Sequence, residues 1–599
     1  MTEIQNPNQQ GGGGGTDSRS LFGFLIVFVL MVVAFQIFGP KKPKPQPEHP
    51  QQKTAQSAQS AAPVPAPASS AAPGSGPAAQ GAAAGKPAPA AKVVQAAGQT
   101  TTIVENKLYR IVFSNRGGQV TSWILKKYTD DRGKPLELVN RDAGSRFGLP
   151  LSLFTYDAGL RTELNSALYV PSATGKLTAP ASLTFQYSAN GLTVRKTFTF
   201  GSTYVIHANV SVTRNGAPVT ALLAWPAGLG DEVTPQQYAT ASFDSSIGGK
   251  SDQTEPKKIV GGKTLQGPFD YAGVSDLYFA AIFMPTQPAD TSAVTFHNTV
   301  DIPKDRQNPK PGEVDHEPIL GAAIGTAGGP VDTRIFVGPK SLSTLKSVHA
   351  ANGQNLEQLM SFGWFGWVSK PMLLVLRFFV THGIPNWGWA ILVLTVILNL
   401  FMLPTRFMMM KSSLKMARIQ PQIESIKAKY AKYARTDPRR QEMNKEMFDL
   451  QRKEGVNMFG GCLPMLLQYP LLFGFYRMLE FAIELRHAHW LWLSDLSAPD
   501  PLHILPLFVI VSMFLSQLFT PSPGMDQTQQ RMMAFMMPLI FGFMMWNLGS
   551  GVCLYWAGSN LIGVGQQMAI NRSSMGREMR ALAAKRAAKK AGKTVNARR

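Results

Sequence analysis

Between residues 102 and 355 the chain alternates apolar and polar positions in short runs. The segment "SLTFQYSANGLTVRKTFTF" does so on both sides of Asn190-Gly191, and an Asn-Gly pair between two alternating runs is typical of a β-hairpin. "TYVIHANVSVTRNGAPVTALLAW" repeats the pattern around Asn215-Gly216, and "KLYRIVFSNRGGQVTSWIL" adds another strand–turn–strand. The pattern predicts a large antiparallel β-sandwich domain at residues 102–355.

From residue 356 onward, long and nearly continuous apolar runs replace this alternation. Five of them are long enough to cross a bilayer: residues 385–405, 458–481, 502–520, 531–548 and 550–568. The earlier run at 371–380 is too short, so residues 356–384 are expected to form a helix at the membrane interface. The sequence thus predicts a core at 385–568, an α-helical bundle of five transmembrane helices that includes a polar helical hairpin at 406–456.

A further apolar run, Leu21–Phe38, is also long enough to be a transmembrane helix. It follows a polar, Gly-rich stretch at 1–20 that is predicted to be disordered, and it precedes a Pro/Ala-rich linker at 39–101. A signal peptide would have a small-residue cleavage site directly after the run, whereas "GPKKPKP" follows it here. The sequence therefore favours an uncleaved anchor helix, with a signal peptide as the alternative.

Positive charge is unevenly distributed along the chain, whose formal net charge is +22. Residues 406–456 hold thirteen Lys or Arg against six Asp or Glu, and residues 569–599 hold ten against one. The loop at 482–501 holds one Arg against three acidic residues. Because Lys and Arg are in excess in cytoplasmic loops, we expect the hairpin, the basic tail at 569–599 and both termini in the cytoplasm, and the β-domain outside. Three lysines directly after the first apolar run point the other way but are outnumbered.

Polar side chains recur inside the predicted transmembrane helices. In "ILVLTVILNLFMLPTR", Thr395 and Asn399 are four residues apart and so lie on one helix face. The other predicted spans carry further polar residues: Gln468, Ser516, Gln517, Ser559 and Asn560. Each could simply form a hydrogen bond between helices. Several of them in one small bundle favour a shared polar cavity, because polar groups in a membrane usually face the bundle interior.

The sequence contains no recognisable signature of an enzyme active site. Cys462 and Cys553 lie in apolar runs, and the nine histidines are scattered, so no cluster has metal-ligand spacing. No phosphate-binding Gly loop or catalytic triad signature occurs, and no predicted span has a midspan Asp, Glu or Lys. We therefore expect no enzyme, no cofactor and no metal. A transporter or channel remains one alternative, and a sugar-binding envelope protein that acts through the β-domain remains another.

Four motifs carry a resemblance to a known family: "FGWFGWVSKPMLLVLRFFV…NWGWAILVLTVILNLFMLP", "NMFGGCLPMLLQYPLLFGFYRML", "WLSDLSAPDP" and "SGVCLYWAGSNLIGVGQQ". They resemble the YidC membrane protein insertases over roughly residues 355–570. The anchor, the linker and the β-domain resemble the Gram-negative form of the family in layout, with its supersandwich-like periplasmic domain. The resemblance implies a multi-pass protein of the bacterial inner membrane that inserts newly made integral membrane proteins and helps them fold, alone or with the Sec translocon.

The resemblance also implies a polar groove, open to the cytoplasm and to lipid, that receives the client. The residues expected to line it are Thr395, Asn399, Gln468, Gln517, Tyr555, Trp556 and Asn560. Implied partners are nascent membrane proteins, the Sec translocon, membrane lipids and the ribosome, but not DNA. Contact of the basic tail with ribosomal RNA is one interpretation of its charge, and attraction to anionic lipid is the other.

One position departs from the family pattern. Members usually carry an arginine five residues before the proline at the end of the second span, and counting back from Pro404 gives Asn399. Arg406 and Arg477 are the candidate substitutes for the missing charge. The alternative for Arg406 is that it extends toward the cytoplasmic membrane surface, and the alternative for Arg477 is a pair with Glu480 one turn away.

Overall fold

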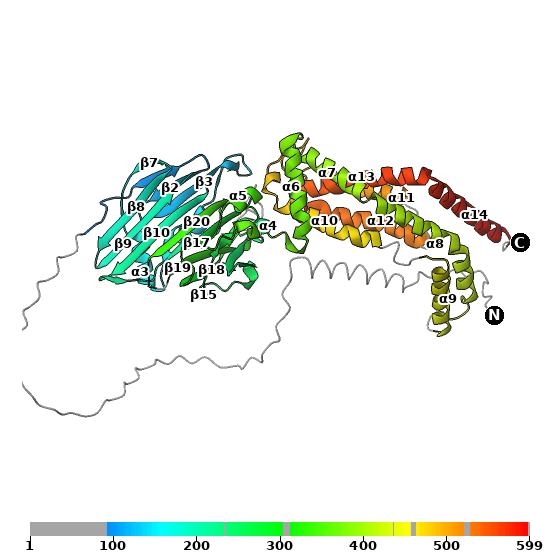
Figure 1. Ribbon diagram of the computed structural model, residues 1–599, viewed down its shortest axis with the longest axis horizontal. Helices are drawn as coiled ribbons and strands as arrows, with labels where there is room; N and C mark the ends of the chain where they lie inside the picture. Colours follow the sequence, from blue (N-terminus) through cyan, green and yellow to red (C-terminus); the bar gives the residue numbers. More distant parts are fainter. Residues whose placement is uncertain are drawn as a thin grey trace, which may run out of the picture. The chain divides into compact units, whose positions relative to one another are not determined.

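The computed structural model describes residues 93–232, 235–303, 312–326, 328–434, 437–456, 463–519 and 527–596, which are the coloured parts of Figure 1. The predicted disordered stretch at 1–20, the predicted anchor helix at 21–38 and nearly all of the linker at 39–101 lie outside the described residues. The described part contains a sheet-rich domain followed by a helical region, as the hydrophobic pattern predicted.

The β-domain contains three sheets in the described part of the chain. The first has the order β4 (Pro135–Glu137), β3 (Gln119–Thr129), β2 (Tyr109–Ser114), β1 (Thr101–Glu105), β7 (Gly175–Thr178). The second, with ten strands, has the order β14 (Lys250–Thr254), β13 (Ser242–Ile247), β16 (Tyr271–Ser275), β17 (Phe279–Pro285), β20 (Val331–Pro339), β10 (Val205–Arg214), β9 (Leu192–Phe200), β8 (Ala181–Ala189), β6 (Val170–Pro171), with β11 (Ala217–Pro218) paired to β10. The third has the order β15 (Thr264–Gln266), β18 (Thr291–Pro303), β19 (Val314–Thr326), β12 (Leu222–Trp225), β5 (Ser152–Phe154).

The predicted hairpin turns are confirmed. Ala189 pairs with Leu192 across Asn190-Gly191, whose φ angles are 54° and 73°. Asn and Gly tolerate these left-handed angles best, which is why this dipeptide fits a tight turn. Asn215-Gly216, with φ angles of 52° and 80°, joins β10 to the short β11 in the same way. These turns are local, so the sequence was sufficient to place them.

Buried aromatic rings join the sheets of the β-domain. Phe113 of β2 lies 5.3 Å from Phe198 of β9, measured between ring centroids, so the first sheet packs on the ten-stranded one. Trp123 of β3 lies 5.8 Å from Trp225 of β12, which connects the first sheet to the third. The short helices of this domain are α2 (Arg141–Phe147), α3 (Ala158–Ser166), η1 (Pro256–Lys258), α4 (Pro235–Tyr238), α5 (Leu342–Ser347) and η2 (Leu356–Leu359).

The helical region follows the β-domain in the sequence. Its helices are η3 (Gly363–Phe365), α6 (Gly366–His382), α7 (Trp387–Phe401), α8 (Leu403–Lys429), α9 (Arg439–Lys453), α10 (Leu463–Phe481), η5 (Ile483–Leu485), α11 (Ile504–Phe519), α12 (Gln527–Met544), η6 (Met545–Asn547), α13 (Ser550–Arg572) and α14 (Ser574–Asn596). A helix therefore lies in each of the five apolar runs, while the number of spans remains a prediction.

No single helix in the described ranges is both long and apolar enough to cross a membrane. The pair α7 and α8 passes that test together, with a 45° bend between them, and α11 and Met532–Asn547 are shorter apolar helices. The bend divides the predicted span at 385–405, and Pro404 in the first turn of α8 explains it. Proline has no N–H to donate to the preceding turn, so the hydrogen-bond ladder is interrupted there.

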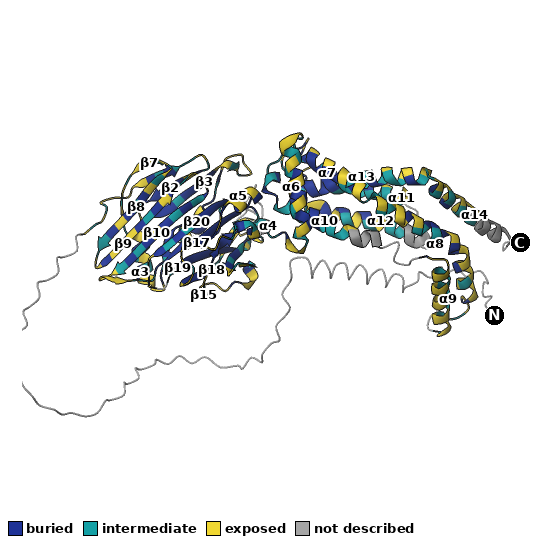
Figure 2. Cartoon of the chain, in the orientation of Figure 1, coloured by how far each residue is buried: buried dark blue, intermediate teal, exposed yellow. Residues whose placement is uncertain are grey.

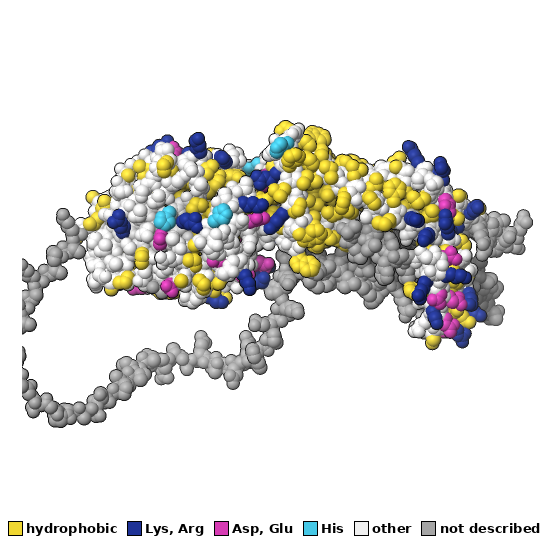
Figure 3. Space-filling model, viewed as in Figure 1, with side chains coloured by type: hydrophobic (Ala, Val, Ile, Leu, Met, Phe, Trp, Pro, Cys, Tyr) yellow, Lys and Arg dark blue, Asp and Glu magenta, His cyan; other side chains and the backbone are white. Residues whose placement is uncertain are grey.

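Large apolar side chains are exposed along the helical region. Phe401 is 70 % exposed and Phe543 82 % exposed, and Trp367, Leu518 and Leu539 are also exposed. Figure 2 shows exposed positions along these helices, and Figure 3 shows hydrophobic side chains gathered over α6 and its neighbours. Soluble monomers rarely expose apolar surface on this scale, so the pattern fits contact with lipid.

Candidate functional site

The polar positions of α7 face α13. Thr395 and Asn399 are both buried on α7. The Thr395 hydroxyl donates to the carbonyl oxygen of Ile391 at 2.7 Å, so its hydrogen is used within its own helix and not for a bond to a partner helix. The Asn399 amide nitrogen donates to the carbonyl oxygen of Thr395 at 2.9 Å and to the Ser559 hydroxyl of α13 at 3.1 Å. The predicted polar face of α7 is therefore present, and Asn399 is the residue that bridges two helices.

Arg406 reaches the same place from the first turns of α8. Its Nη2 atom lies 3.4 Å from the Asn399 side-chain oxygen, to which it donates. A Cβ atom on Gly563 of α13 would lie 3.0 Å from the Nη1 atom of Arg406, so the glycine provides the room for the guanidinium. The Gln566 amide donates to the Asn399 backbone oxygen at 3.2 Å. We call Thr395, Asn399, Arg406, Ser559 and Gln566 the polar cluster.

The charge of Arg406 is not neutralised within the described part of the chain. Arg406 is half-buried, and no carboxylate of a described residue lies within the 4.0 Å at which other ion pairs of the protein are found. Arg477, the other candidate, is paired with Glu480 at 2.8 Å, as its spacing suggested. Arg406, rather than Arg477, is therefore the cation available at Asn399.

The other predicted site residues are distributed over neighbouring helices. Asn560 of α13 donates to the buried Ser512 hydroxyl of α11 at 3.1 Å, which makes a second polar contact beside the cluster. Tyr555 is buried, and its ring stacks on Phe475 of α10 with 4.0 Å between centroids. Trp556 is half-buried against Phe541 of α12, at 5.5 Å.

Two predicted residues are not brought to the polar cluster. Gln468 is exposed on α10, and Gln517 is half-buried on α11. Conversely, the pattern did not assign Ser512 or Gln566 to the site, and it offered Arg406 only as one of two candidate substitutes for the missing arginine. A signal was available for α13, because Ser559 and Gly563 are four residues apart and small residues at this spacing let two membrane helices approach closely. No signal in the sequence placed the Arg406 guanidinium.

Among the described residues, no group of three or more His, Cys, Asp or Glu side chains could hold a metal ion. The polar cluster contains two amides, a guanidinium and two hydroxyl groups, with no activated nucleophile or general base among them. This set of groups can bind polar or anionic segments.

Comparison with known proteins defines the family. The family described as "60Kd inner membrane protein" matches residues 379–578, and the "YidC periplasmic domain" family matches residues 101–375. A membrane protein insertase YidC of Geobacter metallireducens is 34% identical over 573 residues, which are 92% of this chain and 98% of that protein. The chain belongs to the YidC family of membrane protein insertases. The insertase is accordingly not an enzyme, and it is an inner membrane protein with a periplasmic domain.

Other relatives agree. The membrane protein insertase YidC of Geobacter sulfurreducens is 32% identical over 78% of this insertase and 85% of its own length. Among solved structures, an active YidC insertase with its first transmembrane domain resolved is 17% identical, covers 80% of this chain and 95% of its own, and has a TM-score of 0.32. A galactose mutarotase related enzyme of Lactobacillus acidophilus is similar to the β-domain alone, with 10% identity, 40% and 97% coverage and a TM-score of 0.25.

Proposed function

We propose that client proteins enter the membrane through a polar groove built around the polar cluster of α7, α8 and α13. The observation that carries this proposal is the contact of Arg406 with Asn399, which itself bonds Ser559. An unpaired guanidinium beside an amide is costly in an apolar bundle unless water or a ligand satisfies it. A polar client segment supplies such a ligand.

The groove lowers the barrier to transfer of a short client tail. In bare lipid, each unpaired backbone group of that tail costs several kcal/mol. Beside Asn399 and Arg406 the tail finds hydrogen-bond donors, and a carboxylate on the tail finds a positive charge. Burial of the client's apolar helix in lipid then drives the step forward. Tyr555 and Trp556 belong to the apolar wall along which that helix moves.

Arg406 supports this proposal in spite of the departure at position 399. Asn399 stands where the family usually has an arginine. The guanidinium of Arg406, seven residues further along the chain, contacts the Asn399 side chain and so brings a positive charge to the same place. The α7–α8 bend makes this return possible, and Gly563 leaves room for it. Asn399 then serves as the acceptor that holds the guanidinium in place.

The finer organisation is part of the same proposal. We infer the following division: a disordered stretch 1–20, an anchor helix 21–38, a linker 39–101, a periplasmic β-sandwich 102–355, an interfacial helix 356–384, a core of five transmembrane helices 385–568 with a cytoplasmic hairpin 406–456, and a cytoplasmic tail 569–599. The excess of Lys and Arg in the hairpin and the tail supports a cytoplasmic position for both termini. It also supports contact with the ribosome and lipid headgroups, while cooperation with the Sec translocon rests on the family resemblance.

Reconstitution tests the proposal. The insertase is placed in vesicles with no other protein, and a small two-span client is scored by protease protection of its translocated segment. Arg406→Gln is expected to lower the protected fraction about tenfold for a client with an acidic tail, because a charged hydrogen bond is lost. Arg477→Gln is the matched control, since that arginine is already paired with Glu480. Equal protection with and without the insertase would refute the proposal.

A further inference from the structure

Gln566 lies on the face of α13 that forms one side of the polar cluster. Ser559, Gly563 and Gln566 follow one another at spacings of four and three residues, so they share one face of the helix. Ser559 accepts from the Asn399 amide at 3.1 Å, and Gly563 leaves room for the Arg406 guanidinium. The face of α13 that contains Gln566 is therefore the face that meets α7 and α8 at the cluster.

The donor end of the Gln566 side chain is used within the protein. Its Nε2 atom donates to the backbone oxygen of Asn399 at 3.2 Å. Asn399 is in the last turn of α7, which ends at Phe401, and the carbonyls of a last turn have no partner further along their own helix. Gln566 thus supplies a donor to the end of α7. This bond also fixes the amide, because exchanging its two ends would bring the Gln566 oxygen against the Asn399 carbonyl oxygen.

The acceptor end of the same amide has no partner in the described part of the chain. The Oε1 atom of Gln566 is buried, and no described group donates a hydrogen bond to it. Polar side chains next to it on α13 have other partners: Asn560 donates to Ser512 at 3.1 Å, and Gln567 donates to Asn571 at 2.8 Å. A buried acceptor normally has a donor, because leaving it without one costs free energy. The donor for this oxygen therefore has to come from outside the described residues.

Arg406 presents the complementary groups beside the same residue of α7. A guanidinium carries five N–H donors, and the Arg406 side chain forms a single hydrogen bond to a described residue, with the Asn399 side-chain oxygen at 3.4 Å. The main chain of an extended peptide presents one N–H and one C=O per residue, whatever its side chains are. A peptide backbone is therefore a ligand whose donors suit Gln566 Oε1 and whose acceptors suit Arg406.

We propose that Gln566 binds the main chain of the client: its Oε1 atom accepts a hydrogen bond from a backbone N–H of the segment that crosses the membrane. This role rests on the proposed function, which places the client at the polar cluster. The two residues then have different tasks. Gln566 contacts the part of the client that every sequence has in common, whereas Arg406 favours an acidic side chain. The groove accepts neutral tails through Gln566 and gains affinity for acidic tails through Arg406.

Replacing one client amide by an ester tests this contact, because the ester lacks the N–H and leaves every side chain unchanged. A two-span client with a neutral tail carries one ester at successive tail positions. Its insertion into vesicles that contain only the full-length insertase is scored by the initial rate of protease protection. In the parent protein, an ester at one or two positions is expected to lower this rate about fivefold, because one hydrogen bond to Gln566 is lost. In Gln566→Met, the ester and the amide client should insert at the same rate.

Gln567→Met is the matched control. Gln567 is the next residue, is half-buried like Gln566, and donates to Asn571 within its own helix. This variant should keep the full effect of the ester. A substitution that only disturbs the packing of α13 lowers both rates in the same proportion, so the ratio of ester to amide isolates the contact. A ratio that is the same in the parent protein and in Gln566→Met overturns the proposal and assigns water to Oε1.

Crosslinking gives a second measurement that does not depend on how a variant folds. A photoreactive residue is placed in the client at the ester-sensitive position and irradiated with the parent protein. The product is expected to join the client to the segment of α13 around Gln566, and crosslinks to other helices only would overturn the proposal. A client that is protected but has no ester-sensitive position contradicts the role of Gln566 alone. Failure of the proposed function is distinguishable, because then even the all-amide client is protected no better than in empty vesicles.

Discussion

Arg418 of α8 and Glu578 of α14 form a bidentate ion pair, in which Nε donates to Oε1 at 2.7 Å and Nη2 donates to Oε2 at 2.9 Å. The pair joins the basic tail to the helix that carries Arg406. A buried apolar cluster also joins α8 to α14 and the end of α13; its residues are Met410, Leu414, Ala417, Ile570 and Met579. The tail is therefore docked on α8 over its first turns rather than being free along its whole length.

The apolar cluster, not the ion pair, is expected to hold the tail. Both members of the pair are well exposed, and exposed ion pairs contribute little because water and salt screen them. Met579→Ala, which removes a buried side chain, should cost about 2 kcal/mol or more and release α14 to trypsin. Glu578→Gln should leave the cleavage rate close to that of the parent protein. The opposite order of the two variants would assign the docking to the ion pair.

The charge at the polar cluster should be movable between Arg406 and position 399. Asn399→Arg alone places a second guanidinium where Arg406 already lies 3.4 Å from the side chain, so insertion should fall through like-charge repulsion. The double variant Asn399→Arg with Arg406→Gln keeps one cation and should recover activity above that of Arg406→Gln. Insertion of an acidic-tailed client into vesicles measures both. A double variant no better than Arg406→Gln would mean that the position, not the charge, of Arg406 matters.

Asn399 should matter for its polar groups rather than for its volume. Asn399→Leu removes the bonds to Ser559 and Arg406 while keeping a side chain of similar size. Leu398→Ala, at the adjacent position of α7, is the matched control. The first variant should impair insertion more than the second in the same vesicle assay. Equal activity of the two would remove Asn399 from the site.

Glu232 should make the β-domain less stable at neutral than at acidic pH. Burial and Asp276 raise its pKa well above that of an unfolded chain. The folded state therefore binds the proton more tightly, and this contribution is present below about pH 4 and is lost as the pH rises. Glu232→Gln should stabilise the domain at neutral pH, by on the order of 1 kcal/mol, and flatten the pH dependence. Urea unfolding of the full chain at two pH values, followed by β-domain fluorescence, measures this.

Lys196 should affect the pH dependence of stability in the opposite direction to Glu232. Its buried amine donates to the backbone oxygens of Gly117, Gly118 and Leu151, and burial lowers its pKa to about 7. The unfolded chain holds the proton more tightly, so from about pH 7 to about pH 10 this group increases stability as the pH rises. Lys196→Met leaves the three carbonyls without their donor and should cost about 2 kcal/mol or more.

The control for Lys196 is Lys176→Met, which removes an exposed lysine of the same domain that pairs with Glu105. That variant should change the urea midpoint little. A Lys196→Met protein as stable as the control variant would show that water replaces the amine at the three carbonyls.

Features that depend on neighbouring residues were predictable from the sequence. The alternation around Asn190-Gly191 determined both the hairpin and which side chains, such as Phe185 and Phe198, are buried. The apolar runs likewise coincide with α7, α10, α11, α12 and α13, because the length and apolar character of a helix are local properties. The polar face formed by Thr395 and Asn399 followed from helical spacing alone.

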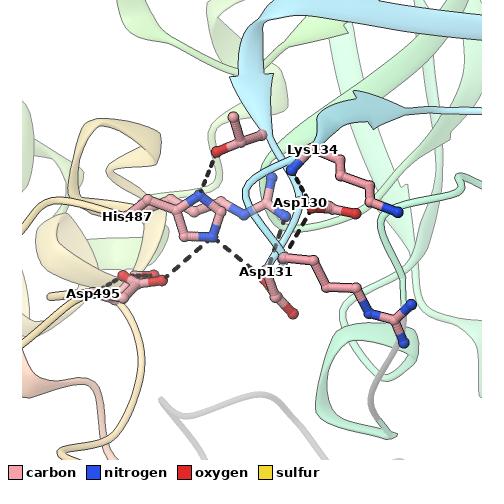
Figure 4. A network of polar contacts seen from close by, with 9 residues as sticks. Asp130, Asp131, Lys134, His487 and Asp495 are labelled. Carbon is pink, nitrogen blue, oxygen red and sulfur yellow. Dashed lines mark hydrogen bonds and ion pairs between the residues drawn. The ribbon is translucent and has the colours of Figure 1, made fainter.

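The contacts that give these elements a function were decided by the tertiary structure. The Arg406 guanidinium reaches Asn399 only because the chain bends after Phe401 and because Gly563 of another helix leaves space. Asp131 and His487 are 356 residues apart in the sequence, yet their side chains meet where the loop between α10 and α11 contacts the β-domain (Figure 4). Periodicity specifies which face of an element is polar, but the partner of that face depends on how distant elements pack, and packing is settled by the whole chain at once.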